Sequence, residues 1–354
     1  MRNKILVINP GSTSTKIAMY SENKQLWQED ILHESAELQK FPTMFSQLPM
    51  RLNLVFSAIE KHGDAPEELV AVSARGGLLP PVASGAYEVN EQMLEVLEHR
   101  PTHLHASNLG AAIAYRIARP LGIKAYIYDP VTVDEMIDIV RVTGLKDVRR
   151  VGRGHNLNMR AAALKYCRES GLDYTRVNII VAHLGGGISV SLHSGGRIAD
   201  LLSDDEGTFS PERAGLIPGY SLLEISESVA RADMMKRLQR GGGLLAHLGT
   251  ADVRKVEQMI AGGDTYAALI YDAMALGVSR DIGKISVIVN GKIDAIVLTG
   301  GIAHSKAFTE KITKRVSFIA PVTLIPGENE MQALADGAWR VLNGTEHARV
   351  YTEV

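Results

Sequence analysis

Two stretches of the sequence resemble each other and lie about half a chain length apart. Residues 5–20 read ILVINPGSTSTKIAMY, and residues 178–196 read NIIVAHLGGGISVSLHSGG. Each consists of an apolar strand, a glycine-containing tip and a second strand. This internal similarity indicates a duplicated architecture, with one glycine-tipped hairpin in each half of the 354-residue chain. We predict two domains whose tips face a shared interdomain cleft.

Short β-branched runs such as KILVIN and DAIVLTG alternate with segments of helical period, which favours an α/β fold. We predict an N-terminal domain over residues 1–150 and a C-terminal domain over 151–328. The final helix, within 329–354, is expected to pack back on the first domain, and the last ten residues are expected to be loosely held. Thr132 and Glu135 match a capping box, which predicts a helix just before the boundary.

Charge and hydropathy exclude several classes of protein. The net charge of −2 gives no basic footprint for nucleic acid or for an anionic membrane. The apolar run in MRNKILVINPG is too short for a signal-peptide core, and no stretch approaches the roughly 18 apolar residues of a membrane span. We therefore expect a cytoplasmic protein. The single cysteine, Cys167, falls in a predicted amphipathic helix and is interpreted as a buried apolar residue.

The first glycine tip carries more hydrogen-bond donors than a turn needs. It offers Asn9, Ser12, Ser14 and Lys16 around Gly11, together with two threonines. Backbone N–H groups of a glycine turn can form a concave seat for an anion, and hydroxyl groups add donors. An ordinary surface turn, rich in turn-forming residues, is the alternative.

Two further loops have the composition of phosphate-binding loops. In the second tip, Gly185, Gly186 and Gly187 remove every Cβ beside His183, so phosphate oxygens can reach the amides. In IVLTGGIAHSKAF, Gly300 and Gly301 join a buried strand to a helix, whose N-terminus can face an anion. Neither loop matches a Walker A or Rossmann motif. Three such loops indicate a nucleotide polyphosphate.

Charged side chains in loops complete the candidate site. Arg75 (SARGGLLPP) and Arg213 (FSPERAGLIPG) can each clamp a carboxylate or a phosphate through two parallel hydrogen bonds. Asp129 ends a buried strand, where a carboxylate needs a partner, although Asp-Pro also begins ordinary turns. His103 and His105 precede a predicted helix whose cap could be the neighbouring serine or asparagine. No cluster of residues has zinc spacing.

The combined motifs resemble those of the butyrate kinases and, more distantly, the acetate kinases, within the sugar kinase/Hsp70/actin superfamily. The resemblance covers nearly the whole chain and rests on NPGSTSTK (9–16), SARGG (73–77), HASNLG (105–110), YDPVTVDEM (128–136), HLGGGISV (183–190), FSPERAG (209–215), LGTADVRKVE (248–257), VLTGGIAHSK (297–306) and NEMQAL (329–334). It implies a duplicated ribonuclease-H-like fold. The sequence differs from the usual motifs of the family at GRGHNLN (152–158) and in the stretch 198–208.

The resemblance also assigns roles by position. It implies catalytic residues Arg75, Asp129, His183 and Arg213. It implies a substrate site of Arg75, Gly77, His105 and His155. It implies nucleotide contacts from Asn9, Ser12, Ser14, Lys16, Gly185, Gly186, Gly187, Asp252, Arg254, Gly300 and Gly301. It implies magnesium ligands Asp129 and Glu330.

The implied reaction is reversible, in-line transfer of a phosphoryl group from ATP to a short-chain carboxylate, giving ADP and an acyl phosphate with Mg²⁺ as cofactor. The glycines at 76 and 77 stand where acetate kinase-like chains carry bulkier residues, so butyrate or a branched relative is the expected substrate. Acetate or propionate kinase is the nearer alternative, and an actin- or Hsp70-like ATPase the more distant one. Related kinases imply a homodimer or a larger homo-oligomer.

Overall fold

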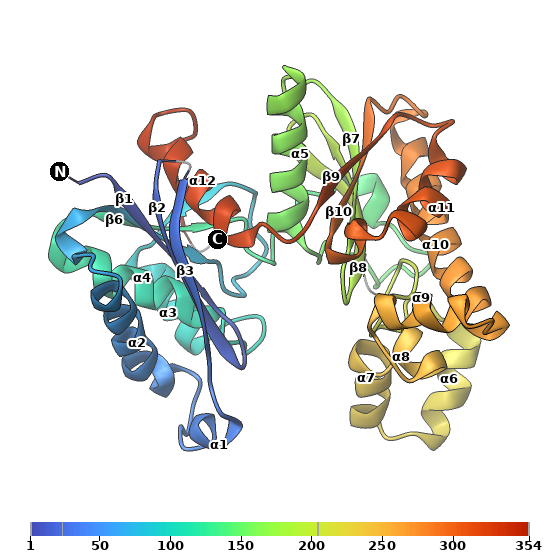
Figure 1. The fold of residues 1–354 in the computed structure, drawn as a ribbon, viewed down its shortest axis with the longest axis horizontal. Helices are drawn as coiled ribbons and strands as arrows, with labels where there is room; N and C mark the ends of the chain where they lie inside the picture. Colours follow the sequence, from blue (N-terminus) through green and yellow to red (C-terminus); the bar gives the residue numbers. More distant parts are fainter. Residues whose placement is uncertain (1, 23, 204, 353–354) are drawn as a thin grey trace. The chain divides into compact units, whose positions relative to one another are not determined.

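A computed structural model describes residues 2–22, 24–203 and 205–352 of the chain. It divides into two compact units, Met1–Asp134 with Asn329–Val354, and Glu135–Glu328 (Figure 1). The first boundary follows Asp134, so residues 135–150 belong to the second unit rather than to the first. The C-terminal segment belongs to the first unit.

Unit 1 is built on a seven-stranded sheet. Its strands are β1 (Lys4–Pro10), β2 (Ser14–Ser21), β3 (Lys24–Leu32), β4 (Leu69–Arg75), β5 (Ala86–Glu88), β6 (Lys124–Tyr128) and β12 (Arg349–Val350), in the order β12-β5-β6-β4-β1-β2-β3. The β1–β2–β3 meander is antiparallel, and β4 runs parallel to both β1 and β6. The expectation of a loose C-terminus is wrong for residues 349–351. There β12 pairs with β5, and the Tyr351 carbonyl accepts a hydrogen bond from Asn90 Nδ2.

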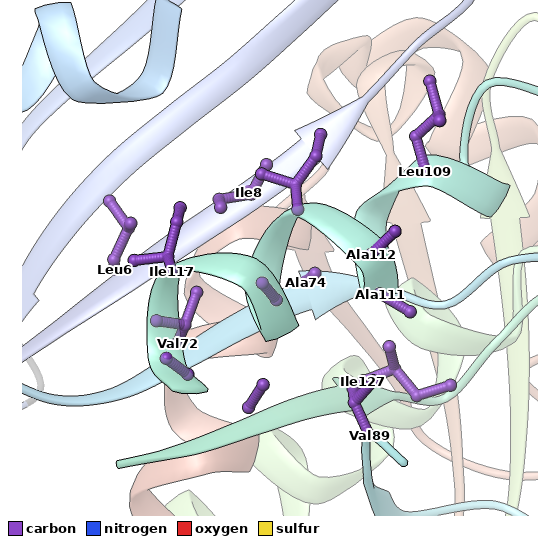
Figure 2. Close-up of a cluster of buried hydrophobic side chains, with 14 of the residues drawn as sticks. Leu6, Ile8, Val72, Ala74, Val89, Leu109, Ala111, Ala112, Ile117 and Ile127 are labelled. Carbon is purple, nitrogen blue, oxygen red and sulfur yellow. The ribbon is translucent and has the colours of Figure 1, made fainter. Parts of the chain in front are cut away.

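Helices cover the two faces of this sheet. They are α2 (Leu48–Lys61), α3 (Glu91–His99) and α4 (Asn108–Leu121) on one face and α12 (Glu330–Leu342) on the other, while the four-residue α1 (Ser35–Leu38) buries no residue. Because side chains alternate along a strand, Leu6 and Ile8 of β1 face the core beneath α4, where they gather with Ile117 (Figure 2). Ser73 of β4 points the other way and donates to the Leu334 carbonyl of α12 at 2.8 Å. Residues of odd number at the end of β1 and β4 therefore face α12.

Unit 2 is built on a five-stranded sheet. Its strands are β7 (Asn178–Leu184), β8 (Ile188–Ser194), β9 (Arg197–Leu202), β10 (Ala295–Gly300) and β11 (Val322–Pro326), in the order β11-β10-β7-β8-β9. Helix α5 (Asn156–Ser170) packs on one face, and α10 (Thr265–Ser286) and α11 (Lys306–Val316) lie on the other (Figure 1). The remaining helices are α6 (Gly219–Ser228), α7 (Arg231–Arg240), α8 (Gly243–Leu248) and α9 (Val253–Ala261).

The two sheets share one topology. The order β3-β2-β1-β4-β6 in unit 1 matches β9-β8-β7-β10-β11 in unit 2, with the same antiparallel meander and the same parallel neighbours. The expected duplicated α/β fold is thus confirmed. In each unit the hairpin identified in the sequence supplies the first two strands of the antiparallel meander.

One predicted helix is absent. Residues 131–137 form turns and extended backbone, and only a short 3₁₀ helix follows at Asp138–Arg141. Thr132 therefore caps no helix. In the part of the chain that the structure describes, no helix has both the length and the apolar character needed to cross a bilayer.

Candidate active site

The tip of the first hairpin is closed by its own backbone. Asn9 pairs with Lys16 in the β1–β2 register, and the Gly11 N–H donates to the Ser14 carbonyl at 2.8 Å. Residues Gly11 to Thr13 therefore form a tight turn at the end of two buried strands. The turn brings the side chains of Asn9 and Lys16 to the edge of the sheet where β4 also ends.

Glu330, at the start of α12, binds two residues from these strand ends. Its Oε2 accepts a hydrogen bond from Asn9 Nδ2 at 2.8 Å, and its Oε1 forms an ion pair with Arg75 Nη1. Arg75 is largely buried, with 13 % of its side chain exposed, and its Nε has no hydrogen-bond partner among the described residues. An arginine held by one edge in this way keeps a buried donor for a ligand.

The charges around Glu330 determine its ionisation. Burial alone would raise the pKa of Glu330, but the charge and hydrogen bond of Arg75, the Asn9 hydrogen bond and the charge of Lys16 outweigh it. The pKa of Glu330 therefore lies below its ordinary value. The carboxylate is ionised at neutral pH and offsets part of the positive charge of Arg75 and Lys16.

These residues line a cavity of about 250 Å³ within unit 1. Its wall is made by Asn9, Pro10, Gly11, Ser14, Lys16, Arg75, His105, Ser107, Val131 and Glu330. His105 accepts a hydrogen bond from the Ser107 N–H through Nδ1, and its Nε2 lies 3.5 Å from Ser12 Oγ. The cavity thus combines a cationic group with the apolar side chains of Pro10 and Val131.

Asp129 lies nearby in sequence but outside the wall of this cavity. It is 1 % exposed, and its Oδ1 accepts the Gly85 N–H at 2.7 Å. Its φ of 39° lies in the left-handed region, which costs a non-glycine residue free energy. A carboxylate held in a strained backbone conformation is a common feature of functional sites.

Gly77 does not border open space. A Cβ built there would lie 2.6 Å from Leu97 Cδ2 and 2.8 Å from the Asn108 Cα, and Gly76 is packed as closely against Pro130. The sequence interpretation, in which missing side chains leave room for a longer substrate, therefore does not fit the packing. Gly77 lets the chain just after β4 approach the start of α4, and Gly76 lets it approach Pro130.

His183 is the central residue of the second cluster, in unit 2. It is 2 % exposed and faces α5, whose Asn158 donates from Nδ2 to His183 Nδ1 at 2.8 Å. In its neutral form His183 therefore carries its proton on Nε2. That nitrogen makes no hydrogen bond within the described chain and lies 3.6 Å from Glu328 Oε1. It is also 2.8 Å from the position of a Cβ built on Gly185.

His155 stacks on His183. The ring centroids are 3.9 Å apart with an interplanar angle of 13°, and His155 Nδ1 lies 3.0 Å from Ser189 Oγ. Together, α5 and β8 fix both imidazole rings beside the glycine tip. The structure therefore places the His155 of the atypical GRGHNLN motif next to His183.

Arg213 packs against the same glycine tip. A Cβ on Gly187 would lie 2.6 Å from the Arg213 Cζ, so only glycine leaves room for the guanidinium in this position. The loop that carries Arg213 is tied to the tip by Ser210 Oγ and by the Glu212 N–H, which donate to the Gly186 carbonyl at 2.7 and 3.2 Å. His183, the glycine tip and Arg213 form one cluster.

The other end of this loop is anchored to α10. Asp281 is buried and accepts the Thr208 N–H at 2.7 Å; burial raises its pKa to about 6. A Cβ on Gly277 would lie 1.9 Å from Thr208 Oγ1, so α10 needs glycine there. In the preceding stretch 198–208, Arg150 forms ion pairs with Asp200 and Glu206, while residue 204 lies outside the described residues.

The Gly300–Gly301 junction lies beside the second tip. Gly300 has a φ of 90°, and a Cβ there would meet the Leu184 carbonyl oxygen at 2.4 Å. Asp252 and Arg254 do not join this cluster through any side-chain bond in the described part of the chain. Asp252 caps α9 through the Arg254 N–H, and the two side chains form an ion pair at 2.9 Å.

Sequence reasoning missed several residues that hold these clusters. Asn158 orients His183, and Ser210 and Glu212 attach the Arg213 loop to Gly186. The signal for Asn158 was weak: an asparagine three residues after His155 lies near it on a helix, but the residue it contacts comes from a distant strand.

Comparisons with known proteins show which family the chain belongs to. The model of the acetokinase family matches residues 147–337. The chain is 44 % identical to a protein named probable butyrate kinase 2 from Caldanaerobacter subterraneus subsp. tengcongensis, over 98 % of this chain and 99 % of that protein. It is also 44 % identical to butyrate kinase 2 from Clostridium acetobutylicum, over 99 % of this chain and all of that protein.

A solved structure shows the same fold. The acetate kinase of Porphyromonas gingivalis superposes with a TM-score of 0.80, at 20 % identity, over 95 % of this chain and 99 % of that chain. At that identity the likeness establishes the fold and no more. The full-length sequence matches and the family model together show that this chain belongs to the acetokinase family.

Proposed function

We propose that this protein transfers the γ-phosphoryl group of ATP to the carboxylate of butyrate or of a branched relative, forming an acyl phosphate and ADP, reversibly. Membership of the acetokinase family makes the chain a carboxylate kinase. The observation that carries the substrate class is the cavity of unit 1. It offers the guanidinium of Arg75 to a carboxylate and the side chains of Pro10 and Val131 to a short alkyl chain.

The chemistry needs no general base, because an aliphatic carboxylate is already ionised at pH 7. The obstacle is the approach of two anions, so catalysis consists of positioning and charge neutralisation. We assign Arg75 and Arg213 to the carboxylate and to the oxygens of the moving phosphoryl group. His183 would donate its Nε2–H to that group, while His105 and His155 line the acceptor side.

The nucleotide is assigned to the glycine loops. We propose that Gly185, Gly186 and Gly187 hold phosphate oxygens through backbone N–H groups, and that Asn9, Ser12, Ser14 and Lys16 add donors from the other tip. Gly300, Gly301, Asp252 and Arg254 are assigned to the adenosine side. Gly300 packs so closely on Leu184 that no larger residue fits at this position, and the resulting loop without a Cβ supports the assignment.

Magnesium fits this donor set in an indirect way. Mg²⁺ is usually bound by one or two carboxylates together with substrate phosphates and several waters. In the described residues no three His, Cys, Asp or Glu side chains converge as a metal cluster. Both oxygens of Glu330 already accept hydrogen bonds, and Asp129 is bonded to Gly85. We propose that these two carboxylates hold Mg²⁺ through water, where it would neutralise charge on the phosphates.

A substrate panel tests the proposal. Purified protein is given ATP, Mg²⁺ and straight or branched acids of two to five carbons, and acyl phosphate is trapped with hydroxylamine. We expect the highest kcat/KM for butyrate or a branched four- or five-carbon acid. A preference for acetate or propionate would move the assignment to those kinases. ATP hydrolysis without acceptor dependence would instead support an actin- or Hsp70-like ATPase and contradict the proposal.

We further propose a cytoplasmic location, which is the expectation drawn from the hydropathy of the sequence. We also propose assembly into a homodimer or a larger homo-oligomer, which rests on family resemblance. Light scattering of the purified protein tests the second, and a monomer at micromolar concentration would contradict it.

A further inference from the structure

Arg51 of α2 is a fully buried cation. It is 0 % exposed, and it lies behind the first glycine tip rather than in the cavity. Its Nη1 donates to the Ser14 carbonyl at 3.0 Å and to Thr15 Oγ1 at 2.9 Å. Its Nε and Nη2 both donate to Gln47 Oε1, at 3.2 and 3.0 Å.

All of these acceptors are neutral. Among the described residues Arg51 contacts no carboxylate, in contrast to Arg150, which pairs with Asp200 and Glu206. Burial lowers the pKa of Arg51 to about 10, so the group still carries its charge at neutral pH. A buried charge without a counter-charge is costly, and proteins rarely retain one without a use.

The bonds of Arg51 also orient the tip. The Ser14 carbonyl accepts from both Arg51 and the Gly11 N–H, and the Thr13 carbonyl accepts from the His33 N–H at 2.9 Å. Both carbonyl groups are therefore engaged by the protein. The N–H groups of Ser12 and Thr13 make no hydrogen bond within the described chain, and both residues are exposed. A turn with bonded carbonyls and free amides favours an anion over a cation.

We propose that Arg51 is a positioning residue that prepares the first glycine tip for a phosphate group of the nucleotide. It ties down the Ser14 carbonyl, and its uncompensated charge attracts the anion from behind the turn. Arg51 does not touch the ligand. This inference rests on the proposed function, which places nucleotide phosphate at the tip.

The alternative is a purely structural role, in which Arg51 only links α2 to β2 through its hydrogen bonds. Gln47→Glu separates the two roles, because a carboxylate of the same shape keeps every bond to Arg51 and supplies the missing counter-charge. A fastening role predicts a protein that binds anions as the wild type does. The electrostatic role predicts weaker anion binding at equal or higher stability.

The test measures the affinities of the full-length protein for ATP and for inorganic phosphate by calorimetry, with thermal unfolding in parallel. We expect Gln47→Glu to weaken both affinities by roughly tenfold, the effect of one nearby charge acting through an effective dielectric constant of about 20. Asn53→Asp is the matched control, since it makes the same amide-to-acid change at an exposed position of α2 and should leave both affinities within about twofold. Arg51→Lys, which keeps the charge, should retain more affinity than Arg51→Gln.

Wild-type affinity for phosphate and ATP in a folded Gln47→Glu protein would overturn the inference. Its failure is distinguishable from failure of the proposed function. If the wild type forms no acyl phosphate but Gln47→Glu still weakens phosphate binding, the role of Arg51 stands and the carboxylate kinase assignment falls.

Discussion

Equivalent positions in the two units carry different side chains. Asn9 and His183 each stand two residues before the first glycine of a tip, and each faces the N-terminal turn of the helix that covers that face of the sheet. Asn9 contacts the ionised Glu330, whereas His183 contacts the neutral amide of Asn158. The duplicated scaffold therefore presents a charged cluster in unit 1 and an imidazole donor in unit 2.

Arg213 is predicted to act in turnover and not in folding. Arg213→Ala should reduce kcat by about 10³-fold, the usual cost of losing an arginine that stabilises a transferring phosphoryl group. ATP affinity should stay within a few-fold, because the glycine loops remain. The hydroxamate assay measures kcat, and calorimetry measures the affinity.

A second variant checks the position of the guanidinium without removing it. Gly187→Ala places a methyl group where the Arg213 Cζ now lies and should displace the side chain. Turnover should fall while thermal stability changes little, because the end of a flexible side chain can move. Activity within a few-fold of wild type in both variants would remove Arg213 from the reaction.

His193 is predicted to make unit 2 sensitive to acid. Its ring is 1 % exposed and bonded to Tyr174 and Ser191, and burial, with a smaller contribution from the charge of Arg160, lowers its pKa from 6.5 to about 3. Below pH 6.5 the imidazole of His193 binds a proton in the unfolded chain but stays neutral in the folded chain. Stability is therefore full above pH 6.5 and falls as the pH drops toward 3.

The expected size at pH 5 is about 2 kcal/mol, from 1.36 kcal/mol for each pH unit below 6.5. Urea unfolding at pH 7.5 and pH 5 measures it. His193→Gln should lose less stability between the two pH values than the wild type, while His304→Gln, at an exposed position, should behave as the wild type. Equal losses in all three proteins would refute this role for His193.

At the scale of elements, the strands were predictable and some of their surroundings were not. The apolar runs KILVIN and DAIVLTG became β1 and β10, because burial on both faces leaves an unambiguous pattern. The helix expected from Thr132 does not form, since a capping box is a local signal that tertiary structure can override. The partners of Arg75 and His183 come from elements distant in the sequence. No local pattern could therefore show that Glu330 forms an ion pair with Arg75 or that Asn158 donates a hydrogen bond to His183.

The close packing just after β4 leads to a prediction about the acyl chain length that the protein prefers in its substrate. Gly77→Val would force a side chain against Leu97 and the Asn108 backbone, and it should lower the stability by about 1–3 kcal/mol, as overpacked cores do. Selectivity should depend on Val131 instead, because its side chain lines the cavity.

Val131→Phe should lower kcat/KM for butyrate more than for acetate. Butyrate has two further methylene groups, each worth about 0.8 kcal/mol when buried, so the acetate/butyrate ratio should rise by up to about 15-fold. Kinetics with both acids, together with melting curves for Gly77→Val, measure the two effects. An unchanged ratio in Val131→Phe would show that the alkyl chain does not reach Val131.

At the scale of the whole molecule, duplication is the feature that the sequence revealed most clearly. Two glycine-tipped hairpins about half a chain apart predicted a duplicated architecture, and five strands of the first sheet follow the same order as the five strands of the second. The position of the boundary between the two units was harder to predict from the sequence. It follows Asp134 and not residue 150, because residues 135–150 contact unit 2: the Ile137 N–H donates to Ala199, and Arg150 binds Asp200 and Glu206.

The central claim is that a carboxylate oxygen attacks the γ-phosphorus of ATP directly. The most direct test supplies butyrate labelled with ¹⁸O in both carboxylate oxygens, together with ATP and Mg²⁺, and follows the product by ³¹P NMR. Our account predicts an acyl phosphate whose phosphorus carries one labelled bridging oxygen, formed in equal amount with ADP. Release of ADP and unlabelled inorganic phosphate without any acyl phosphate would contradict it.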